Sequence, residues 1–285
     1  MGRVIDAHVH FWNPGILHYP WLSETPALQR AFLPDHLGAL GMGSAEGVIF
    51  VEANCQPSQA ESELDFVDRL AANEPRILAS VAYVDLHEAH SRGAALRRLS
   101  HRQRVVGVRQ NIQGQPRGFC LAPEFVRGVR EASRNGFTFD LCITPNQLDD
   151  AIELVRHCPD VRFVLDHCAK PAIRDNAFSP WALAIERLAM HEHVSCKLSG
   201  LMTESRSDQR NAAALRPYVE HVRACFGANR LLYGSDWPVC TLAGGEGLWR
   251  DIVGELTADW SPDERRAFYS DNAIRLYGLA RNANR

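Results

Sequence analysis

Eight short apolar or β-branched runs alternate with helical stretches along almost the whole chain. In the helical stretches, apolar residues recur three and four positions apart, as in Leu64, Val67 and Ala71. This alternation favours a parallel sheet built from repeated βα units. Eight units in 285 residues predict an α/β fold, a single-domain (β/α)8 barrel spanning residues 1–285. The expected strands are residues 4–10, 47–53, 77–84, 105–110, 137–143, 162–168, 194–199 and 231–237.

The composition excludes several classes of protein. Hydrophobic and charged fractions of 46% and 23% are those of an ordinary globular protein and argue against disorder. A net charge of −3, with acidic and basic residues interspersed, argues against a nucleic-acid or membrane-surface partner. No apolar run approaches the roughly 18 residues of a transmembrane helix, and the first residues lack the apolar core of a signal peptide. We therefore expect a small-molecule partner, and the number of subunits stays open, a homo-oligomer included.

The eight cysteines are scattered without CxxC pairs. Cys142, Cys168 and Cys196 fall inside expected strands. This usage predicts reduced, mostly buried thiols and a cytoplasmic location.

The first expected strand, Val4–His10, carries polar side chains on one face. Alternation places Asp6, His8 and His10 on that face and the apolar residues on the other. In a parallel barrel, inward residues near the carboxyl end of a strand reach the active site. Two histidines at i and i+2, about 6.6 Å apart along a strand, can direct their imidazoles at one ion. The alternative is a pair of hydrogen-bonded histidines in a buried strand.

Polar side chains also stand at the ends of the later expected strands, where barrel enzymes place their reactive groups. Of the neighbours Asp166 and His167 only one is expected to face inward, because successive strand residues point to opposite faces. The residues at these ends are Glu52, Arg109 with Gln110, Asp140 or Cys142, Asp166 or His167, Lys197 and Asp236.

Asp236 is the carboxylate best placed for catalysis. Pro238 ends the last strand just after it, which leaves the side chain at the rim of the barrel. A carboxylate there can take a proton from water and later return it to a leaving alkoxide. Its structural alternative is a turn or helix-capping role.

The other strand-end residues each allow two interpretations. His167 could be a third metal ligand or a proton donor, or it could be structural. Arg109 could bind a substrate group bidentately or form one half of an ion pair. Lys197 could act on the substrate or extend to the rim. Glu52 could orient a neighbouring histidine or act directly.

Residues 16–33 show no clear period and contain the aromatic sequence His18-Tyr19-Pro20-Trp21. A loop this long is often a lid or a pocket wall. The alternative is that its aromatic residues, with Trp12, only pack over the rim of the barrel. The capping box Ser261–Glu264, with proline at the first helical position, predicts the start of the last helix.

A set of short motifs spans almost the whole chain: Asp6–Trp12, Tyr19–Leu22, Gly107–Arg109, Leu165–His167 with Lys170–Pro171, Lys197–Gly200 and Gly234–Pro238. With these motifs the chain resembles the amidohydrolase superfamily, and within it the lactonase branch of L-fuconolactonase-like, L-rhamnonolactonase-like and 2-pyrone-4,6-dicarboxylate-lactonase-like proteins. The Tyr-Pro-Trp-Leu motif at Tyr19–Leu22 resembles the sugar-lactonase side of the branch.

The resemblance implies a hydrolase of cyclic esters with a role in carbohydrate catabolism. It also implies that His8, His10, His167 and Asp236 form the site. Lys197 stands where many superfamily members place a histidine, which argues against two metal ions. One divalent ion, zinc by its preference for imidazole and carboxylate ligands, is expected, and metal-free catalysis stays open.

The mechanism expected on this basis is hydrolysis of a small lactone, with Asp236 and His167 as the catalytic residues. Asp236 deprotonates water, which attacks a carbonyl polarised by the metal or the histidines. Asp236 then returns the proton to the ring oxygen. Rival interpretations are an aminocarboxymuconate-semialdehyde-type decarboxylase, an amidase or imidase, and a non-enzymatic binding protein. Six residues are expected to shape the substrate pocket: Arg109, Trp12, His18, Trp21, Lys197 and Trp237.

Overall fold

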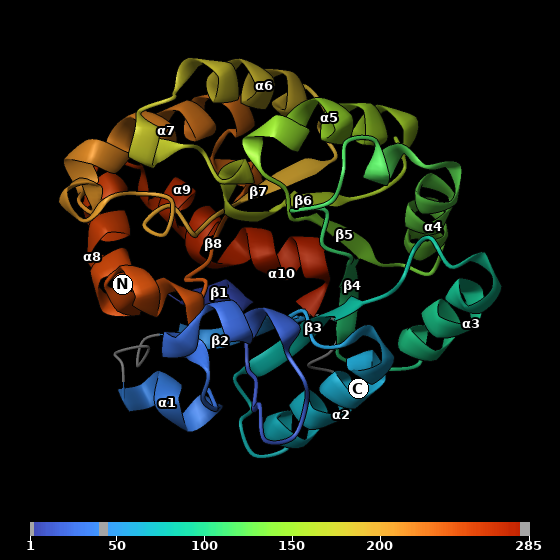
Figure 1. The fold of residues 1–285 in the computed structure, drawn as a ribbon. Coiled ribbons are helices and arrows are strands. Elements are labelled where there is room, and N and C mark those ends of the chain that lie inside the picture. The colour runs from blue at the N-terminus through green and yellow to red at the C-terminus, as the bar shows by residue number, and fades with distance from the viewer. Residues whose placement is uncertain (1–2, 40–44, 280–285) are drawn as a thin grey trace.

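The computed structural model describes residues 3–39 and 45–279, and they form a barrel of parallel strands surrounded by helices (Figure 1). The strands follow one another around the barrel in chain order, each paired with the next. They are β1 (Val4–Val9), β2 (Ala45–Val51), β3 (Ile77–Tyr83), β4 (Val105–Arg109), β5 (Thr138–Leu141), β6 (Phe163–Leu165), β7 (Val194–Leu198) and β8 (Leu231–Tyr233).

The residues that follow β8 close the barrel against β1. The backbone N–H of Asp236 donates to the carbonyl of His8 at 3.0 Å, and that of His10 donates to the carbonyl of Trp237 at 2.8 Å. The prediction of a (β/α)8 barrel is therefore confirmed.

Helices cover the outside of the barrel (Figure 1). The capping box predicted at Ser261 starts α9, since the Ser261 hydroxyl accepts from the Glu264 N–H and the Glu264 carboxylate accepts from the Ser261 N–H. The helices are α1 (Pro34–Ala39), α2 (Ala60–Ala71), α3 (Ala89–Ser100), α4 (Pro123–Arg134), α5 (Leu148–His157), α6 (Ser179–Ala189), α7 (Ala212–Phe226), α8 (Gly245–Leu256), α9 (Pro262–Arg266) and α10 (Asn272–Tyr277).

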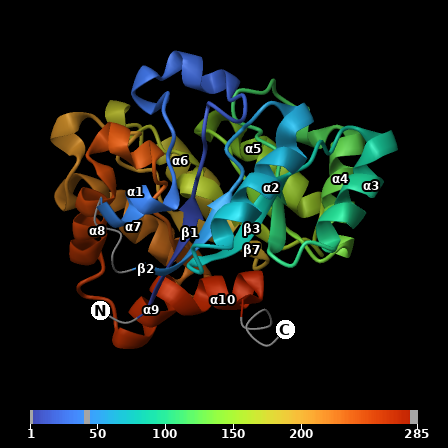
Figure 2. The ribbon, with the colours of Figure 1, turned by 90° about the horizontal axis from the view of Figure 1, so that it is seen from below.

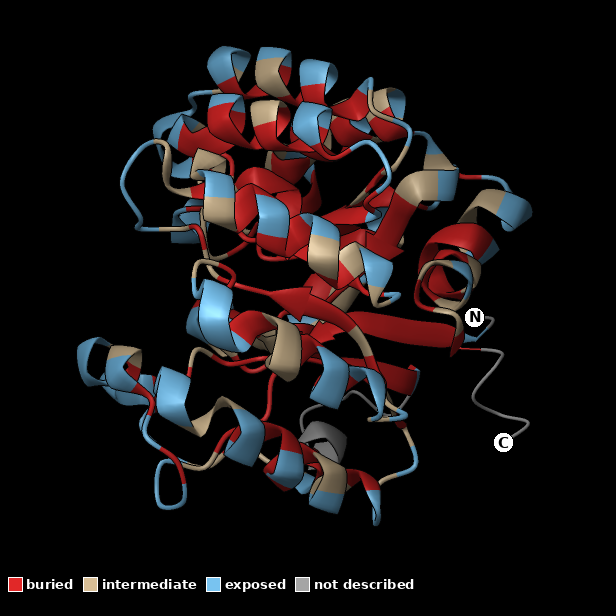
Figure 3. Ribbon diagram, turned by 90° about the vertical axis from the view of Figure 1, so that its right-hand side faces the viewer, coloured by how far each residue is buried: buried red, intermediate tan, exposed pale blue. Residues whose placement is uncertain are grey.

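The core has an inner and an outer part. Most strand residues are buried, while the helices keep an exposed outer face (Figure 3). Inside the barrel, Ile5, Ile49, Val164 and Leu232 form one cluster, although they come from strands on opposite sides. The helix α10 adds Tyr277 to this cluster and closes the amino-terminal end of the barrel. Burial of this apolar surface is the main source of stability.

The predicted alternation of side chains along β1 fails between Asp6 and Val9. Ala7 packs in the inner cluster with Val164, whereas Val9 packs outside with Phe50 and Trp237. The register between β1 and β2 shifts between Asp6 and Val9, and such an irregularity interrupts the regular alternation of side chains. Asp6 therefore does not share a face with the histidines, and its carboxylate accepts from the backbone N–H of His8 and Ser235.

Several predicted strands extend past the observed ends, and the sixth and eighth do so most. The sixth ends at Leu165 rather than 168, and the eighth ends at Tyr233 rather than 237. After β6 the chain turns sharply, because residues 167–170 all have positive φ, between 51° and 58°. This turn sets where the side chains that follow β6 point.

The aromatic segment 16–33 lies over the carboxyl-terminal end of the barrel, opposite α10 (Figure 2). It contains two short 3-10 helices, Pro20–Glu24 and Pro26–Leu28. Trp12 anchors it through paired backbone hydrogen bonds with Phe32 and an indole N–H that donates to the carbonyl of Arg30. Trp12 therefore packs over the rim of the barrel. That the more exposed residues of the segment form a pocket wall stays a prediction.

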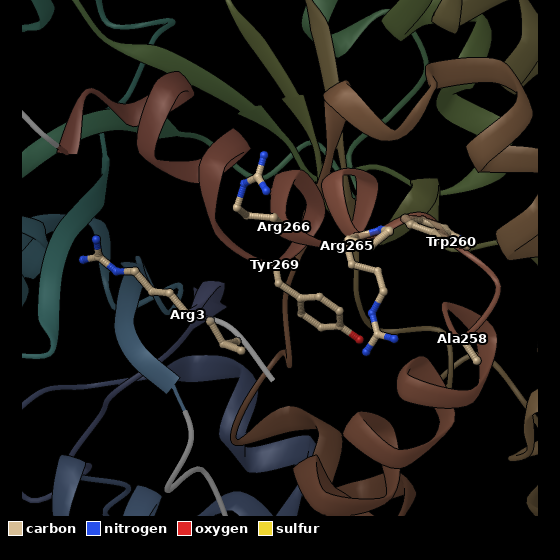
Figure 4. A pocket seen from close by; sticks show the side chains of 8 residues that line it. Arg3, Ala258, Trp260, Arg265, Arg266 and Tyr269 are labelled. Carbon is tan, nitrogen blue, oxygen red and sulfur yellow. The ribbon is translucent and has the colours of Figure 1, made fainter.

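A cavity of about 550 Å³ opens at the other end of the barrel. Arg3, Trp260 and Tyr269 contribute to its lining, and Figure 4 shows the Arg265 guanidinium beside the Tyr269 ring. These residues precede β1 or belong to α9 and its surroundings. Barrel enzymes carry their chemistry at the carboxyl-terminal end, so this cavity is not the candidate active site.

All eight cysteines lie in the described part of the chain, and their thiols are free. Seven of them are buried, as predicted. Across residues 3–39 and 45–279, the helices are too short or too polar to traverse a bilayer.

Candidate active site

Three imidazoles surround the carboxylate of Asp236 at the carboxyl-terminal end of the barrel. The Oδ1 atom of Asp236 lies 3.8 Å from Nε2 of His8, 3.5 Å from Nε2 of His10 and 3.9 Å from Nε2 of His167. All four side chains are buried. The structure therefore brings together the four residues that the resemblance implied for the site.

The backbone explains how these side chains converge. His8 lies on β1 and His10 directly after it, so the two imidazoles reach the same end of the barrel. Asp236 follows β8 with a φ of 59°, a left-handed conformation that turns its carboxylate toward them. His167 enters from the left-handed turn after β6.

The prediction that only one of Asp166 and His167 faces inward is wrong. His167 faces Asp236, and Asp166 Oδ1 lies 3.2 Å from Nδ1 of His8. Alternation holds only inside a strand, and β6 ends at Leu165, just before this pair. The turn then brings both side chains to the site.

Hydrogen-bond partners fix the proton position on one of the imidazoles. Nδ1 of His10 lies 2.7 Å from the carbonyl of Val51, which can only accept, so Nδ1 carries the proton. Nδ1 of His8 has two neighbours at 3.2 Å, the Asp166 carboxylate, which can only accept, and the Lys197 ammonium, which can only donate, so each neutral tautomer of His8 has a partner. In the tautomer with the proton on Nδ1, the Nε2 atoms of His8 and His10 direct lone pairs at each other across 3.2 Å. A cation between them would satisfy both.

His167 has a different partner. Its Nδ1 lies 2.9 Å from the hydroxyl of Ser199, which can donate or accept. Both neutral tautomers are therefore available to His167. In one tautomer Nε2 can bind a metal, and in the other it can donate a hydrogen bond to substrate.

The electrostatics give each group the charge that this chemistry needs. Burial holds the pKa of His8 well below its ordinary value and does the same for His167, so both rings are neutral. Burial alone would raise the pKa of Asp236, but His167 and His10 outweigh it and hold the pKa below its ordinary value. An ionised carboxylate thus faces the neutral imidazoles of His8 and His167 at neutral pH, as a metal site or a general base requires.

The donor set fits a zinc ion. Two nitrogen ligands about 2.0–2.1 Å from zinc in a tetrahedral site lie about 3.4 Å apart, and the His8 and His10 Nε2 atoms lie 3.2 Å apart. The ligand atoms of His8, His10 and Asp236 all lie within 4.8 Å of one another. His167 belongs to a second such group, with His8 and Asp166, so the four expected ligands do not form one compact set.

A buried ion network lies directly beneath the site. The Lys197 Nζ atom lies 2.5 Å from Asp140 and 3.0 Å from Asp166. Arg109 binds Glu52 through Nε at 2.6 Å and Asp166 through a terminal nitrogen at 3.2 Å. Asp166 is thus held by two cations while it faces His8. The pKa of Asp166 is well below its ordinary value, because Lys197 and His8 outweigh the effect of burial.

The network decides between the alternatives for three strand-end residues. Arg109 forms a buried ion pair, and Glu52 orients Arg109 rather than a histidine. Lys197 is buried beneath the site and does not extend to the rim. Its charge is offset by two carboxylates, so it opposes a bound cation less than an unpaired lysine would.

The remaining candidate pocket residues differ in how far their side chains are buried. Trp12 and Trp237 have no exposed surface, so they support the pocket from behind rather than contact its contents. Trp21 is half-buried and donates from its indole to the carbonyl of Ala53 at 2.8 Å. His18 is exposed on the aromatic segment. Substrate contact stays a prediction for Trp21 and His18.

Sequence reasoning missed the pairing of Lys197 with Asp140 and the contact of Ser199 with His167. The polar face of β5 and the serine after β7 are visible in the sequence. Their partners are not, because each contact joins different strands of the closed barrel. A further residue, Lys170, was noticed only as part of a matching motif.

The comparisons with known proteins agree with this geometry. The sequence pattern of the amidohydrolase family matches residues 5–279. An L-fucono-1,5-lactonase of Burkholderia multivorans is 34% identical, over 98% of this chain and 97% of that protein. An L-rhamnono-gamma-lactonase of Scheffersomyces stipitis is 26% identical, over 61% of this chain and 59% of that protein.

A solved structure extends the similarity to the fold. The crystal structure of an amidohydrolase from Burkholderia multivorans with bound zinc matches at a TM-score of 0.87 and 32% identity. The match covers 98% of this chain and all of that one. With the eight-stranded barrel, the histidine cluster and a sequence match along nearly its full length, the chain belongs to the amidohydrolase family.

Proposed function

We propose that this protein hydrolyses a small sugar-acid lactone. The observation that carries the proposal is the ionised Asp236 carboxylate surrounded by three imidazoles at the active end of the barrel. The printed activities of the related L-fucono-1,5-lactonase and L-rhamnono-gamma-lactonase support the same class of substrate. Both activities open a ring ester and release a hydroxy acid.

Asp236 acts as the general base in the proposed reaction. Its carboxylate takes a proton from a water molecule, whose oxygen attacks the carbonyl carbon of the ring. His167, in the tautomer with a proton on Nε2, donates a hydrogen bond to the carbonyl oxygen as negative charge develops there. The tetrahedral intermediate collapses with cleavage of the bond to the ring oxygen. Asp236 returns its proton to that oxygen, which becomes a hydroxyl group of the product.

A single zinc ion is the proposed cofactor, held by His8, His10 and Asp236. Bound there, zinc would supply Lewis-acid polarisation of the carbonyl. His10 presents an unprotonated Nε2 atom because the Val51 carbonyl engages its Nδ1. His8 does so in the tautomer whose Nδ1 proton faces Asp166.

A screen of lactones with a pH indicator tests the function. Sugar-acid lactones and aromatic-pathway lactones are offered to protein purified without chelator, and elemental analysis measures its metal. We expect turnover of a sugar-acid lactone, about one zinc per chain, and loss of most activity after extensive chelation, since bound zinc would polarise the carbonyl.

The outcomes separate the two parts of the proposal. Failure to open any lactone contradicts the function. Full activity at less than roughly 0.1 metal per chain contradicts the zinc site and leaves the histidines and Asp236 to act alone.

A further inference from the structure

The chain contains only two lysines, Lys170 and Lys197, among its 31 lysine and arginine residues. Both lie at the carboxyl-terminal end of the barrel, next to the candidate active site. Lysine and arginine are not interchangeable, because the ammonium is a compact charge with three donors and the guanidinium is a planar fork. Lys197 has its role in the buried ion network. Lys170 has none in the reaction proposed above.

The backbone brings Lys170 to the mouth of the site. It is the last residue of the left-handed turn that carries His167, and its N–H donates to the His167 carbonyl at 2.8 Å. Its side chain is half-buried, and Nζ donates to Oε1 of Gln113 at 2.5 Å. Gln113, which follows β4, is itself held by its N–H to the carbonyl of Cys142 at 2.9 Å. Loops after three neighbouring strands thus fix the ammonium in place.

The charge of Lys170 is directed at the site rather than neutralised. Within residues 3–39 and 45–279, no carboxylate lies within 4.0 Å of its Nζ, whereas Lys197 has two. Its charge acts on Asp236 and on Glu204, a half-buried residue after β7. Burial raises the pKa of Glu204, and Lys170 opposes that shift. Lys170, a hydrogen-bond donor, and Glu204, an acceptor, are therefore both close enough to Asp236 to interact with its charge.

This arrangement suits a ring that carries hydroxyl groups. After one proton goes to Gln113, the Lys170 ammonium keeps two donors, and Glu204 offers an acceptor for a hydroxyl proton. A lactone without hydroxyl groups would leave these groups unpaired. Sites built to bind a hydroxyl discriminate strongly against analogues that lack it.

We propose that Lys170, positioned by Gln113, binds a hydroxyl group of the substrate and so selects polyhydroxylated lactones over unsubstituted ones. This inference rests on the proposed lactone hydrolysis and names the feature of the ring that is recognised.

Kinetics of Lys170→Met and Lys170→Arg on two substrates test the inference. The substrates are the best sugar-acid lactone of the wild type and the unsubstituted lactone of the same ring size. Loss of a charged hydrogen bond should lower kcat/KM for the sugar lactone on the order of 10–100-fold. The loss should appear in KM, with kcat within about threefold, because the hydroxyl is bound equally in substrate and transition state. Activity on the unsubstituted lactone should hold in both variants.

Arg187→Met is the matched control, since Arg187 is an exposed residue of α6 whose guanidinium pairs with Asp149. It should leave both activities unchanged. Equal losses on both lactones would overturn the inference, because Lys170 would then act through its charge on Asp236. No loss on either would also overturn it. Both of these results are obtained with an active wild type, so they leave the proposed lactone hydrolysis intact. A wild type that opens no lactone would instead overturn the proposed hydrolysis together with the inference about Lys170.

Discussion

Replacing Asp236 with asparagine is expected to lower kcat on the best lactone on the order of 10²–10⁴-fold, because the amide cannot accept the proton of water. The fold should be preserved. Asp236 has a φ of 59°, and asparagine is among the residues that tolerate this conformation. The backbone hydrogen bond to His8 that helps to close the barrel does not involve the side chain.

Steady-state kinetics and elemental analysis of the same Asp236→Asn preparation check this expectation. The metal content separates loss of the base from loss of the ion. Asp208→Asn is the control, since its carboxylate is exposed on the loop after β7 and should not affect turnover. Near-normal kcat in Asp236→Asn would show that another group takes the proton.

Replacing Lys197 with methionine is expected to destabilise the protein by about 3–5 kcal/mol, the usual cost of removing one partner from a buried ion pair. Lys197, Asp140 and Asp166 have no exposed surface. Burial lowers the pKa of Lys197, but Asp140 and Asp166 outweigh it and raise the pKa above the ordinary value. Without the ammonium, two carboxylates would remain in the barrel, and among residues 3–39 and 45–279 Arg109 would be the cation still paired with one of them, Asp166.

Urea unfolding of Lys197→Met measures this loss. Arg98→Met is the matched control, because the Arg98–Glu61 pair is short, at 2.6 Å, yet more than half exposed. An exposed pair of this kind contributes about 0–1 kcal/mol. Adding Asp140→Asn to Lys197→Met should recover part of the stability by removing one unpaired charge. A change within about 1 kcal/mol in Lys197→Met alone would contradict a role of the network in stability.

The fold was predictable because its signal is local and repeated. Each strand–helix unit shows its own periodicity, and eight units in one chain leave few alternatives to a barrel. His8, His10 and Asp236 were predictable for a related reason. Residues at the carboxyl-terminal ends of parallel strands meet at one end of a barrel, and this does not depend on how the side chains pack.

The errors arise where local rules give way to tertiary structure. A register shift reverses the expected orientation of residues in β1, and a left-handed turn directs both Asp166 and His167 at the site. Neither feature leaves a pattern in the sequence. The partners of Arg109 and Lys197 were equally hidden, because ion pairs across a barrel join residues far apart in the chain.

Isotope labelling of the product tests most directly whether water attacks the ring carbonyl. The purified wild type opens its best sugar-acid lactone in water enriched in oxygen-18, and the quenched product is fragmented in a mass spectrometer. Attack at the carbonyl carbon places one labelled oxygen in the new carboxylate and none in the hydroxyl derived from the ring oxygen. Label in that hydroxyl, with an unlabelled carboxylate, would contradict Asp236-assisted hydrolysis at the carbonyl.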